Sequence, residues 1–191
     1  DVLDINGDGL SERLYSNPNV EYNDIHLFYN TGSSFSDQEQ TVLHSVPKYG
    51  TYAYIQSNVS HWDTDADFID LNNDGLIDRV VKDSNNDYWK VYWNNGAGLE
   101  SQPTLWSLPV SPGLPADQFR TIRKWAAEGT SLDAFDINGD GLPDRILVWT
   151  TEGSPPAEHQ SNRIFLNTGS GFSTEPIIYQ NVPRTSTYAY I

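Results

Sequence analysis

One ten-residue pattern occurs three times in this chain of 191 residues, and it constrains the fold more than any other feature. The copies read DINGDGLSER at 4–13, DLNNDGLIDR at 70–79 and DINGDGLPDR at 136–145, so successive copies are 66 residues apart. A fixed period of this length marks supersecondary units that bury their apolar faces against their neighbours. The sequence therefore predicts three stacked repeats.

Two further blocks keep the same register. The first follows each loop and reads FYNTGSSF at 28–35, YWNNGAGL at 92–99 and FLNTGSGF at 165–172. It predicts a strand followed by a tight turn, because Gly readily adopts positive φ. The second block reads TYAYI at 51–55 and again at 187–191. We divide the chain into a first repeat at 1–49, truncated at its N-terminus, two repeats at 50–115 and 116–183, and the start of a further repeat at 184–191.

Short alternating segments predict β-structure. Ile25, Leu27 and Tyr29 alternate with polar or edge residues, and a similar alternation runs from Trp89 to Trp93. The segment 117–129 has two interpretations: a helix with an apolar face, or a strand. Its place in the repeat matches the TYAYI segment and favours a strand. We expect an all-β fold.

Each acidic loop carries Asp, Asn and Asp at positions 1, 3 and 5, Gly at position 6, and Asp or Glu at position 9. Ca²⁺ takes six to eight oxygen ligands, and alternate positions of a tight loop can converge on one ion. We expect three Ca²⁺ ions, with main-chain carbonyls at position 7 and side chains at the other positions. The predicted ligands are Asp4, Asn6, Asp8, Leu10 and Glu12; Asp70, Asn72, Asp74, Leu76 and Asp78; and Asp136, Asn138, Asp140, Leu142 and Asp144.

Several alternatives to calcium are weaker. All-oxygen ligands disfavour Zn²⁺ and Cu²⁺, and Mg²⁺ prefers to keep several waters. An EF-hand requires Glu at position 12 of the loop, where this chain has Tyr15, Val81 and Leu147. Asn-Gly and Asp-Gly pairs also form plain hairpin turns, but three copies in fixed register favour calcium.

Composition narrows the class of partner. Asp and Glu number 26 against 11 Lys and Arg, which gives a net charge of −15. That charge argues against nucleic acid and favours a cation. The absence of Cys excludes disulfides and thiolate metal sites, and the absence of Met suggests a processed chain or part of a longer one. No apolar run is long enough to span a membrane.

The loop pattern D-x-N-x-D-G-L-x-D-R, followed by N-T-G-x-G-F, resembles the FG-GAP and VCBS repeats. These occur in integrin α-subunit propellers, some fungal-type lectins and the shell-forming B subunits of bacterial toxin complexes. The loop and turn motifs of this chain are most similar to those of the bacterial group. The resemblance implies a β-propeller with one four-stranded antiparallel blade per repeat and Ca²⁺ in a loop joining two strands. Three units of 66 residues are too few for a typical closed ring. We expect the blades to belong to a larger ring or to associate head to tail, as in a filament.

The repeated Arg residues, the Trp residues and the His residues are further candidates for a function. Arg13, Arg79 and Arg145 follow position 9, and we expect them to pair with Asp1, Asp67, Asp133 or nearby loop acids rather than with a ligand. The Trp residues can stack on sugars or simply pack between strands. No catalytic motif is present, and the four His residues lie in different contexts. The expected function is that of a non-enzymatic scaffold or adhesion module, extracellular or on the cell surface, whose structure calcium stabilises. Two alternatives stay open: a carbohydrate-binding lectin, or a shell segment of a toxin complex.

Overall fold

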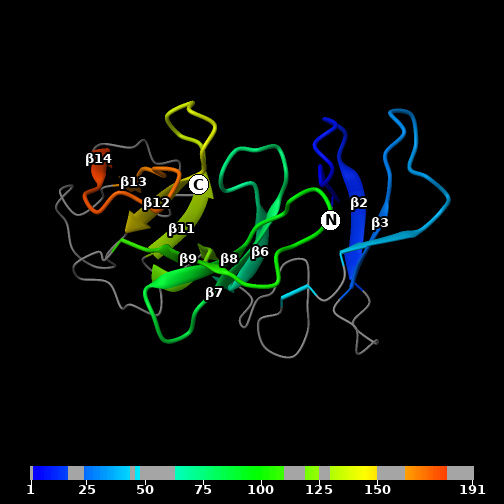
Figure 1. Ribbon diagram of the computed structural model, residues 1–191. Coiled ribbons are helices and arrows are strands. Elements are labelled where there is room, and N and C mark those ends of the chain that lie inside the picture. The colour runs from blue at the N-terminus through cyan, green and yellow to red at the C-terminus, as the bar shows by residue number, and fades with distance from the viewer. Residues whose placement is uncertain are drawn as a thin grey trace.

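The computed structural model describes residues 2–16, 24–43, 46–47, 63–109, 119–124, 130–149 and 162–179. These residues form three antiparallel β-sheets (Figure 1) and one helical turn at Phe119–Arg120. None of their helical residues belongs to a helix long and apolar enough to cross a membrane. Several features singled out from the sequence lie outside the described residues: both TYAYI segments, the start of a further repeat, Asp1, Trp62, Trp125, His44, His61 and His159.

The first two sheets each contain four strands in sequence order, as the repeat predicts. The first sheet consists of β1 (Val2–Leu3), β2 (Glu12–Ser16), β3 (Ile25–Phe28) and β4 (Gln40–Leu43). The second consists of β6 (Ala66–Ile69), β7 (Asp78–Lys82), β8 (Tyr88–Tyr92) and β9 (Thr104–Ser107). In both of these sheets the acidic loop joins the first two strands, so the predicted strand–loop–strand arrangement is confirmed.

The third sheet has six strands instead of the four expected. Its order is β14 (Ile177–Tyr179), β13 (Asn162–Phe165), β12 (Asp144–Trp149), β11 (Thr130–Phe135), β10 (Arg123–Lys124) and β5 (Asp63–Thr64). β10 falls within the segment 117–129, which has a helical turn at its start and a strand further on. Only residues 119–124 of that segment are described. They include a strand, which the repeat register favours, and the rest of the segment lies outside the described residues.

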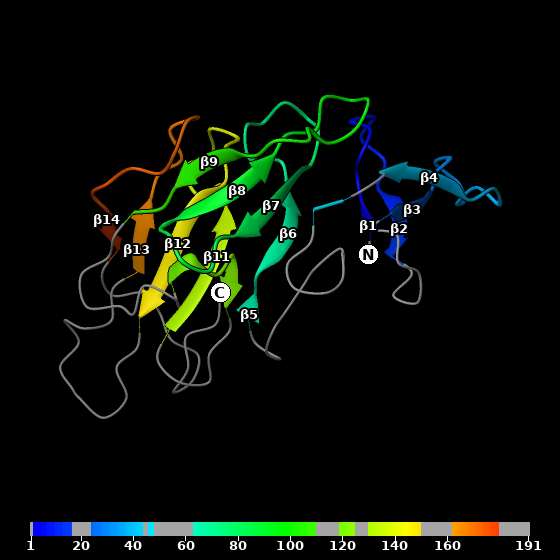
Figure 2. The same ribbon diagram turned by 60° about the horizontal axis from the view of Figure 1, so that its bottom comes forward.

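One extended segment serves two sheets. β5 and β6 are consecutive and are separated only by a bend at Asp65, yet β6 pairs with β7 in the second sheet while β5 pairs with β10 in the third. Main-chain bonds reinforce the junction, since the Ile122 amide donates to the Thr64 carbonyl at 2.8 Å. Figure 2 shows β5 continuing the line of β6 beneath the second sheet. Backbone pairing thus ties the second and third sheets together.

The sheets pack face to face in chain order. Leu14, Ile25 and Leu27 of the first sheet form a core cluster with Phe68 of the second. The opposite face of the second sheet, which carries Val80, Trp89 and Val91, packs against residues of the third that include Leu132, Leu147 and Phe165. The second sheet therefore packs against the first sheet on one face and against the third on the other.

The second sequence block forms the same turn in all three repeats. Isolated β-bridges join Asn30 to Phe35, Asn94 to Leu99 and Asn167 to Phe172. The side-chain oxygen of each Asn accepts a hydrogen bond from the Gly two residues later, at 2.9 to 3.1 Å. Those glycines have φ near 80°, a left-handed conformation that L side chains resist. The prediction of a strand followed by a tight turn is confirmed.

Candidate metal-binding loops and an inter-sheet cleft

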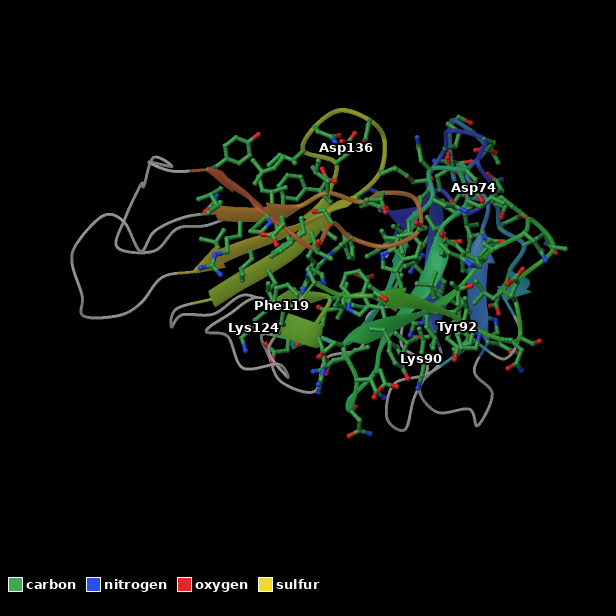
Figure 3. The ribbon with its side chains drawn as sticks, turned by 60° about the vertical axis from the view of Figure 1, so that its left-hand side comes forward. Asp74, Lys90, Tyr92, Phe119, Lys124 and Asp136 are labelled. Atoms are coloured by element: carbon green, nitrogen blue, oxygen red, sulfur yellow. The ribbon has the colours of Figure 1, made fainter. Side chains whose placement is uncertain are left out.

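The three acidic loops lie on one side of the molecule. They join β1 to β2, β6 to β7 and β11 to β12, and all three project toward the top in Figure 1. Asp74 and Asp136 mark two of these loops in Figure 3, where Lys90 and Lys124 lie at the opposite side of the sheets. The strand order thus gathers the predicted metal ligands of separate repeats on a single face.

Each loop is closed by hydrogen bonds between its own residues. In the third loop the Asp136 carboxylate accepts from the amides of Gly139 and Gly141 at 2.7 and 2.8 Å. These N–H groups, with Gly141 contributing most, hold the pKa of Asp136 below its ordinary value. The side chain of Asn138 donates to Asp140 at 2.8 Å, and Asp140 also accepts from the Leu142 amide at 2.8 Å. Positions 1, 3 and 5 are therefore held in one compact, oxygen-rich turn.

Neighbouring loops approach each other closely. A Cβ atom on Gly7 of the first loop would lie 3.0 Å from the main-chain oxygen of Gly75 in the second. A Cβ atom on Gly141 of the third loop would overlap the side-chain amide of Asn73 in the second. Asn73 is the one described non-Gly residue with positive φ, at 58°. Position 4 of each loop therefore faces position 6 of the next.

The acid at position 9 has a different environment from the other three ligand positions. Asp78 is fully buried, and its two oxygens accept from the amides of Leu71 at 3.1 Å and Asn94 at 2.9 Å. It therefore ties the acidic loop to the Asn-Gly turn of the same repeat. Burial raises the pKa of Asp78 to about 7, and the nearby Asp74 and Asp70 carboxylates add to that rise.

The same arrangement recurs in the other repeats. Glu12 and Asp144 are also fully buried, and each accepts from position 2 of its loop and from the Asn of its turn. The longer side chain of Glu12 makes longer bonds, at 3.2 and 3.5 Å, than most of those in the other two copies. The acid at position 9 therefore joins the acidic loop to the Asn-Gly turn in every repeat, which explains why all three copies carry an acid there.

The chemistry of the loops fits a hard cation, although the acids do not yet surround one point. Positions 1, 3 and 5 present carboxylate and amide oxygens together, which is the ligand type that Ca²⁺ prefers. Among the described residues, no three acidic or His side chains are arranged to hold a metal ion. Binding by position 9 would require its carboxylate to accept its amide donors and a cation at once. The fifteen ligands remain a prediction.

Two of the repeated Arg residues, Arg79 and Arg145, are buried, and main-chain carbonyls accept hydrogen bonds from both. Arg145 is fully buried, and its guanidinium donates to the carbonyls of Phe119, Thr121 and Ile122. Burial lowers the pKa of Arg145, and the charge of Asp133, the carboxylate expected as its partner, opposes that shift. The hydrogen bonds of the guanidinium nevertheless go to the main chain that links the second sheet to the third. Its guanidinium also lies over the Trp89 ring at 4.9 Å.

Asp67 and Asp133 pair with another cation. Both carboxylates lie 3.3 Å from Nε of Arg123, which stands on β10 between the second and third sheets. The sequence pattern could not assign this pair, because Arg123 lies outside the repeated blocks. The ion pairs add to the backbone junction between those sheets.

A small cleft opens between the first and second sheets, beside the acidic loops. It has a volume of about 130 Å³ and is lined by Ile5, Asn6, Tyr29, Leu76, Asn94, Gly96, Ala97 and Gly98. Its walls therefore combine an aromatic ring, two aliphatic side chains, two amide side chains and exposed main chain. The cleft is smaller than typical ligand pockets of about 300–1,000 Å³, and it places polar and apolar groups side by side.

The corresponding junction between the second and third sheets is closed. There the side chain of Asn167 donates to the main-chain oxygen of Leu71 at 2.9 Å, and Asn167 is buried. The equivalent Asn94 makes no such bond to Ile5 among the described contacts. The sequences of the two turns, NNGAGL and NTGSGF, share the Asn and both glycines and do not indicate this difference.

The described Trp residues are poor candidates for sugar stacking. Trp89 and Trp106 are fully buried, and Trp93 packs edge-on against Trp106 at 5.7 Å. The first two serve as core residues, so stacking on their faces is excluded. Tyr29, which the sequence indicates only as a residue of an alternating strand, is the aromatic residue that lines the cleft.

No protein-family model matches the chain, and no curated protein matches it. Among solved structures, the chain is similar to an Agrocybe aegerita lectin, studied for its specific recognition of non-reducing terminal N-acetylglucosamine. The TM-score is 0.53 and the identity 15%, over 95% of this chain and 38% of the lectin. A Photorhabdus luminescens Tc holotoxin pore aligns with TM-score 0.35 and 13% identity, over 98% of this chain and 10% of that one. The likeness to the lectin shows a shared fold.

Proposed function

We propose that this chain is a non-enzymatic glycan-binding module of propeller-type blades, in which Ca²⁺ fixes the acidic loops beside the sugar site. The observation that carries the proposal is the cleft between the first and second sheets, with Tyr29 and Asn94 in its lining. The chain spans 38% of the length of the lectin it resembles, so the proposal concerns this module.

The cleft suits one sugar ring. A volume of about 130 Å³ is small, so it admits one edge of a sugar ring and excludes an oligosaccharide. Tyr29 and Leu76 offer apolar surface to the C–H face of a sugar. The side-chain oxygen of Asn94 already accepts from Gly96, which leaves its NH₂ group to donate to a hydroxyl. The fold shared with a lectin that recognises terminal N-acetylglucosamine supports the same ligand class here.

Calcium would stabilise the first acidic loop, which borders the cleft. Asn6 lines the cleft and also belongs to the first acidic loop, where it bonds to Asp8. Ca²⁺ held by positions 1, 3 and 5 would offset the repulsion between Asp4 and Asp8 and hold Asn6 in place. Extracellular calcium, at about millimolar concentration, suits weak sites of this kind.

Titration calorimetry with an N-acetylglucosamine-terminated oligosaccharide, in calcium buffer, tests the proposal. We expect saturable binding at one site per chain, weakened tenfold or more by Tyr29→Ala. Tyr179→Ala on β14 is the matched control, because that ring is exposed and lies outside the cleft. Absence of binding to a panel of terminal sugars, or equal loss in both variants, would reject the cleft as a glycan site.

A further inference from the structure

The cleft lies beside two residues whose counterparts, one repeat later, bond to each other. Between the second and third sheets, the side-chain NH₂ group of Asn167 donates to the main-chain oxygen of Leu71 at 2.9 Å. Asn94 and Ile5 are the corresponding residues between the first and second sheets, because Asn94 begins the turn of the second repeat and Ile5 holds position 2 of the first loop. Both of them line the cleft.

The local hydrogen bonds of Asn94 and Ile5 match those of their counterparts. The main-chain N–H of Asn94 donates to Asp78 at 2.9 Å, and its side-chain oxygen accepts from the Gly96 amide at 3.1 Å. The main-chain N–H of Ile5 donates to Glu12 at 3.2 Å, as the corresponding amide does in the second repeat. These bonds leave one donor, the Asn94 NH₂ group, and one acceptor, the Ile5 carbonyl.

Neither of these two groups has a hydrogen-bond partner among the described contacts. Asn94 is 5% exposed and Ile5 is 4% exposed, so both residues lie almost entirely within the protein. Buried polar groups are normally hydrogen-bonded, because a donor or acceptor that leaves water without a partner is unfavourable. A buried donor and a buried acceptor that border one cleft therefore indicate a ligand that supplies the missing partners.

The positions of the donor and the acceptor favour an amide over a hydroxyl group. Ile5 belongs to the first repeat and Asn94 to the second, so the acceptor and the donor come from different walls of the cleft. A trans amide is planar, and its N–H and C=O point in opposite directions, so one amide group can bond to both walls. A hydroxyl group carries its donor and its acceptor on a single atom and spans a shorter distance.

The rest of the lining suits the other parts of an acetamido sugar. Leu76 is half-buried and Ala97 is exposed, and both line the cleft with apolar side chains. Gly98 leaves room beside them, because a Cβ atom at that position would meet nothing within 4 Å. The cleft therefore combines a donor, an acceptor and apolar groups, which match the carbonyl, the N–H and the methyl group of an acetamido substituent.

We propose that the cleft selects an acetamido sugar over a sugar that carries only hydroxyl groups, and that Asn94 and Ile5 recognise the acetamido group. This assignment rests on the proposed glycan-binding function. The acetamido carbonyl accepts from the Asn94 NH₂ group, and the acetamido N–H donates to the Ile5 carbonyl. The acetyl methyl group packs against Leu76 and Ala97, while the C–H face of the sugar ring lies on Tyr29.

Calorimetric titration in calcium buffer with three methyl glycosides tests this assignment. The three ligands carry an acetamido group, a hydroxyl group or an O-acetyl ester at C2 of the same glucose ring. We expect the acetamido sugar to bind at least about tenfold more tightly than the hydroxyl sugar, because a site with buried polar groups rejects a ligand that leaves them unpaired. The ester keeps the carbonyl and the methyl group but has no N–H, so it should bind with intermediate affinity.

Asn94→Asp removes the donor and keeps the turn. Its carboxylate can still accept from the Gly96 amide, but it has no NH₂ group. We expect this variant to reduce the preference for the acetamido sugar to less than about twofold, because the acetamido carbonyl then meets an acceptor. Asn30→Asp is the matched control and should keep the full preference, because Asn30 holds the same turn position and lies outside the cleft.

The outcomes separate this assignment from the proposed function. If the acetamido and hydroxyl sugars bind equally well and Tyr29→Ala weakens both, the cleft binds glycans but does not recognise the acetamido group. If Asn94→Asp keeps the preference, Asn94 is not the donor. An ester that binds as tightly as the amide would exclude the Ile5 carbonyl as an acceptor. If no sugar binds to the unaltered protein, the glycan-binding function and this assignment both fail.

Discussion

The side chain of Asn167, in the turn of the third repeat, donates a hydrogen bond to the main-chain oxygen of Leu71 in the second acidic loop at 2.9 Å. The bond spans two repeats and is buried, so it links the turn of one sheet to the loop of the preceding sheet. Asn94 holds the equivalent place one repeat earlier, where the cleft is open. The same turn therefore closes one junction and lines a site at the other.

This pair gives a matched test of the cross-repeat bond. Asn167→Ala and Asn94→Ala both remove the acceptor of a turn amide, but only Asn167→Ala also leaves Leu71 without its donor. We expect Asn167→Ala to destabilise the protein by about 1–2 kcal/mol more than Asn94→Ala. Urea denaturation of both variants measures the difference, and equal losses would show that the cross-repeat bond adds nothing.

Calcium should stabilise the protein at the acidic loops. Each loop holds several carboxylates on one face, and their repulsion is uncompensated without a cation. We expect calorimetry of chelator-treated protein to show about three sites and excess chelator to lower the melting temperature. Asp140→Asn should remove one site, whereas Asp37→Asn, at an exposed position outside the loops, should leave the count unchanged. An identical melting curve with and without chelator would contradict calcium binding.

Glycan affinity should depend on the first loop and not on the third. Asn6 belongs to both the first loop and the cleft, while the third loop has no residue in the cleft. We expect Asp8→Asn to weaken binding of the terminal sugar severalfold, and Asp140→Asn to leave it unchanged. Titration of the two variants side by side in calcium buffer separates a local effect of the first loop from general destabilisation.

The Arg residues that follow the acidic loops should contribute unequally to stability. Arg145→Ala removes a buried guanidinium and leaves the carbonyls of Phe119, Thr121 and Ile122 without donors. We expect it to cost at least about 3 kcal/mol, since a lost bond to a charged group alone costs about 1.5–3 kcal/mol. Arg13→Ala, at an exposed position, should cost less than about 0.5 kcal/mol in dilute solution. Similar losses in thermal unfolding would contradict this account.

Asp83 should make stability depend on acid pH. Its carboxylate accepts from Lys90 Nζ at 2.8 Å and from the amides of Asn85 and Asn86, and these bonds, the Lys90 bond first, hold its pKa below the ordinary value. The stabilisation is present above the unfolded pKa of about 3.9 and is lost as pH falls toward the folded pKa. Asp83→Asn should therefore destabilise the protein at pH 7 and progressively less below about pH 4. A pH-independent effect would assign the loss to packing.

The sequence predicted the features that depend on local chemistry. The acidic loops, the strands around Leu27 and Val91, and the Asn-Gly turns all form as their spacing indicates, because Gly and alternating apolar residues act over a few positions. It could not predict that β5 and β10 add to the third sheet. Each is two residues long and polar, so its pairing depends on the sheets that surround it.

Side-chain interactions that depend on tertiary packing also could not be predicted from the sequence. The Arg that follows each loop suggests an Arg–carboxylate pair. In the structure, main-chain carbonyls accept the hydrogen bonds of the buried Arg145 guanidinium. Asp67 and Asp133 instead form ion pairs with Arg123. The cleft lies beside Asn94, which makes no bond to Ile5 among the described contacts, and no local pattern signals that difference from Asn167.

The bend at Asp65 has a consequence for how the chain reaches this structure during synthesis. Asp63–Thr64 emerges with the second repeat but finds its partner only when Arg123–Lys124 has left the ribosome, about 60 residues later. At synthesis rates of about 5–20 residues per second, that edge waits several seconds for its partner. The second repeat can form its four strands in this interval and then serve as the template on which the third is assembled. The order of the repeats along the gene would thereby set the order of their folding.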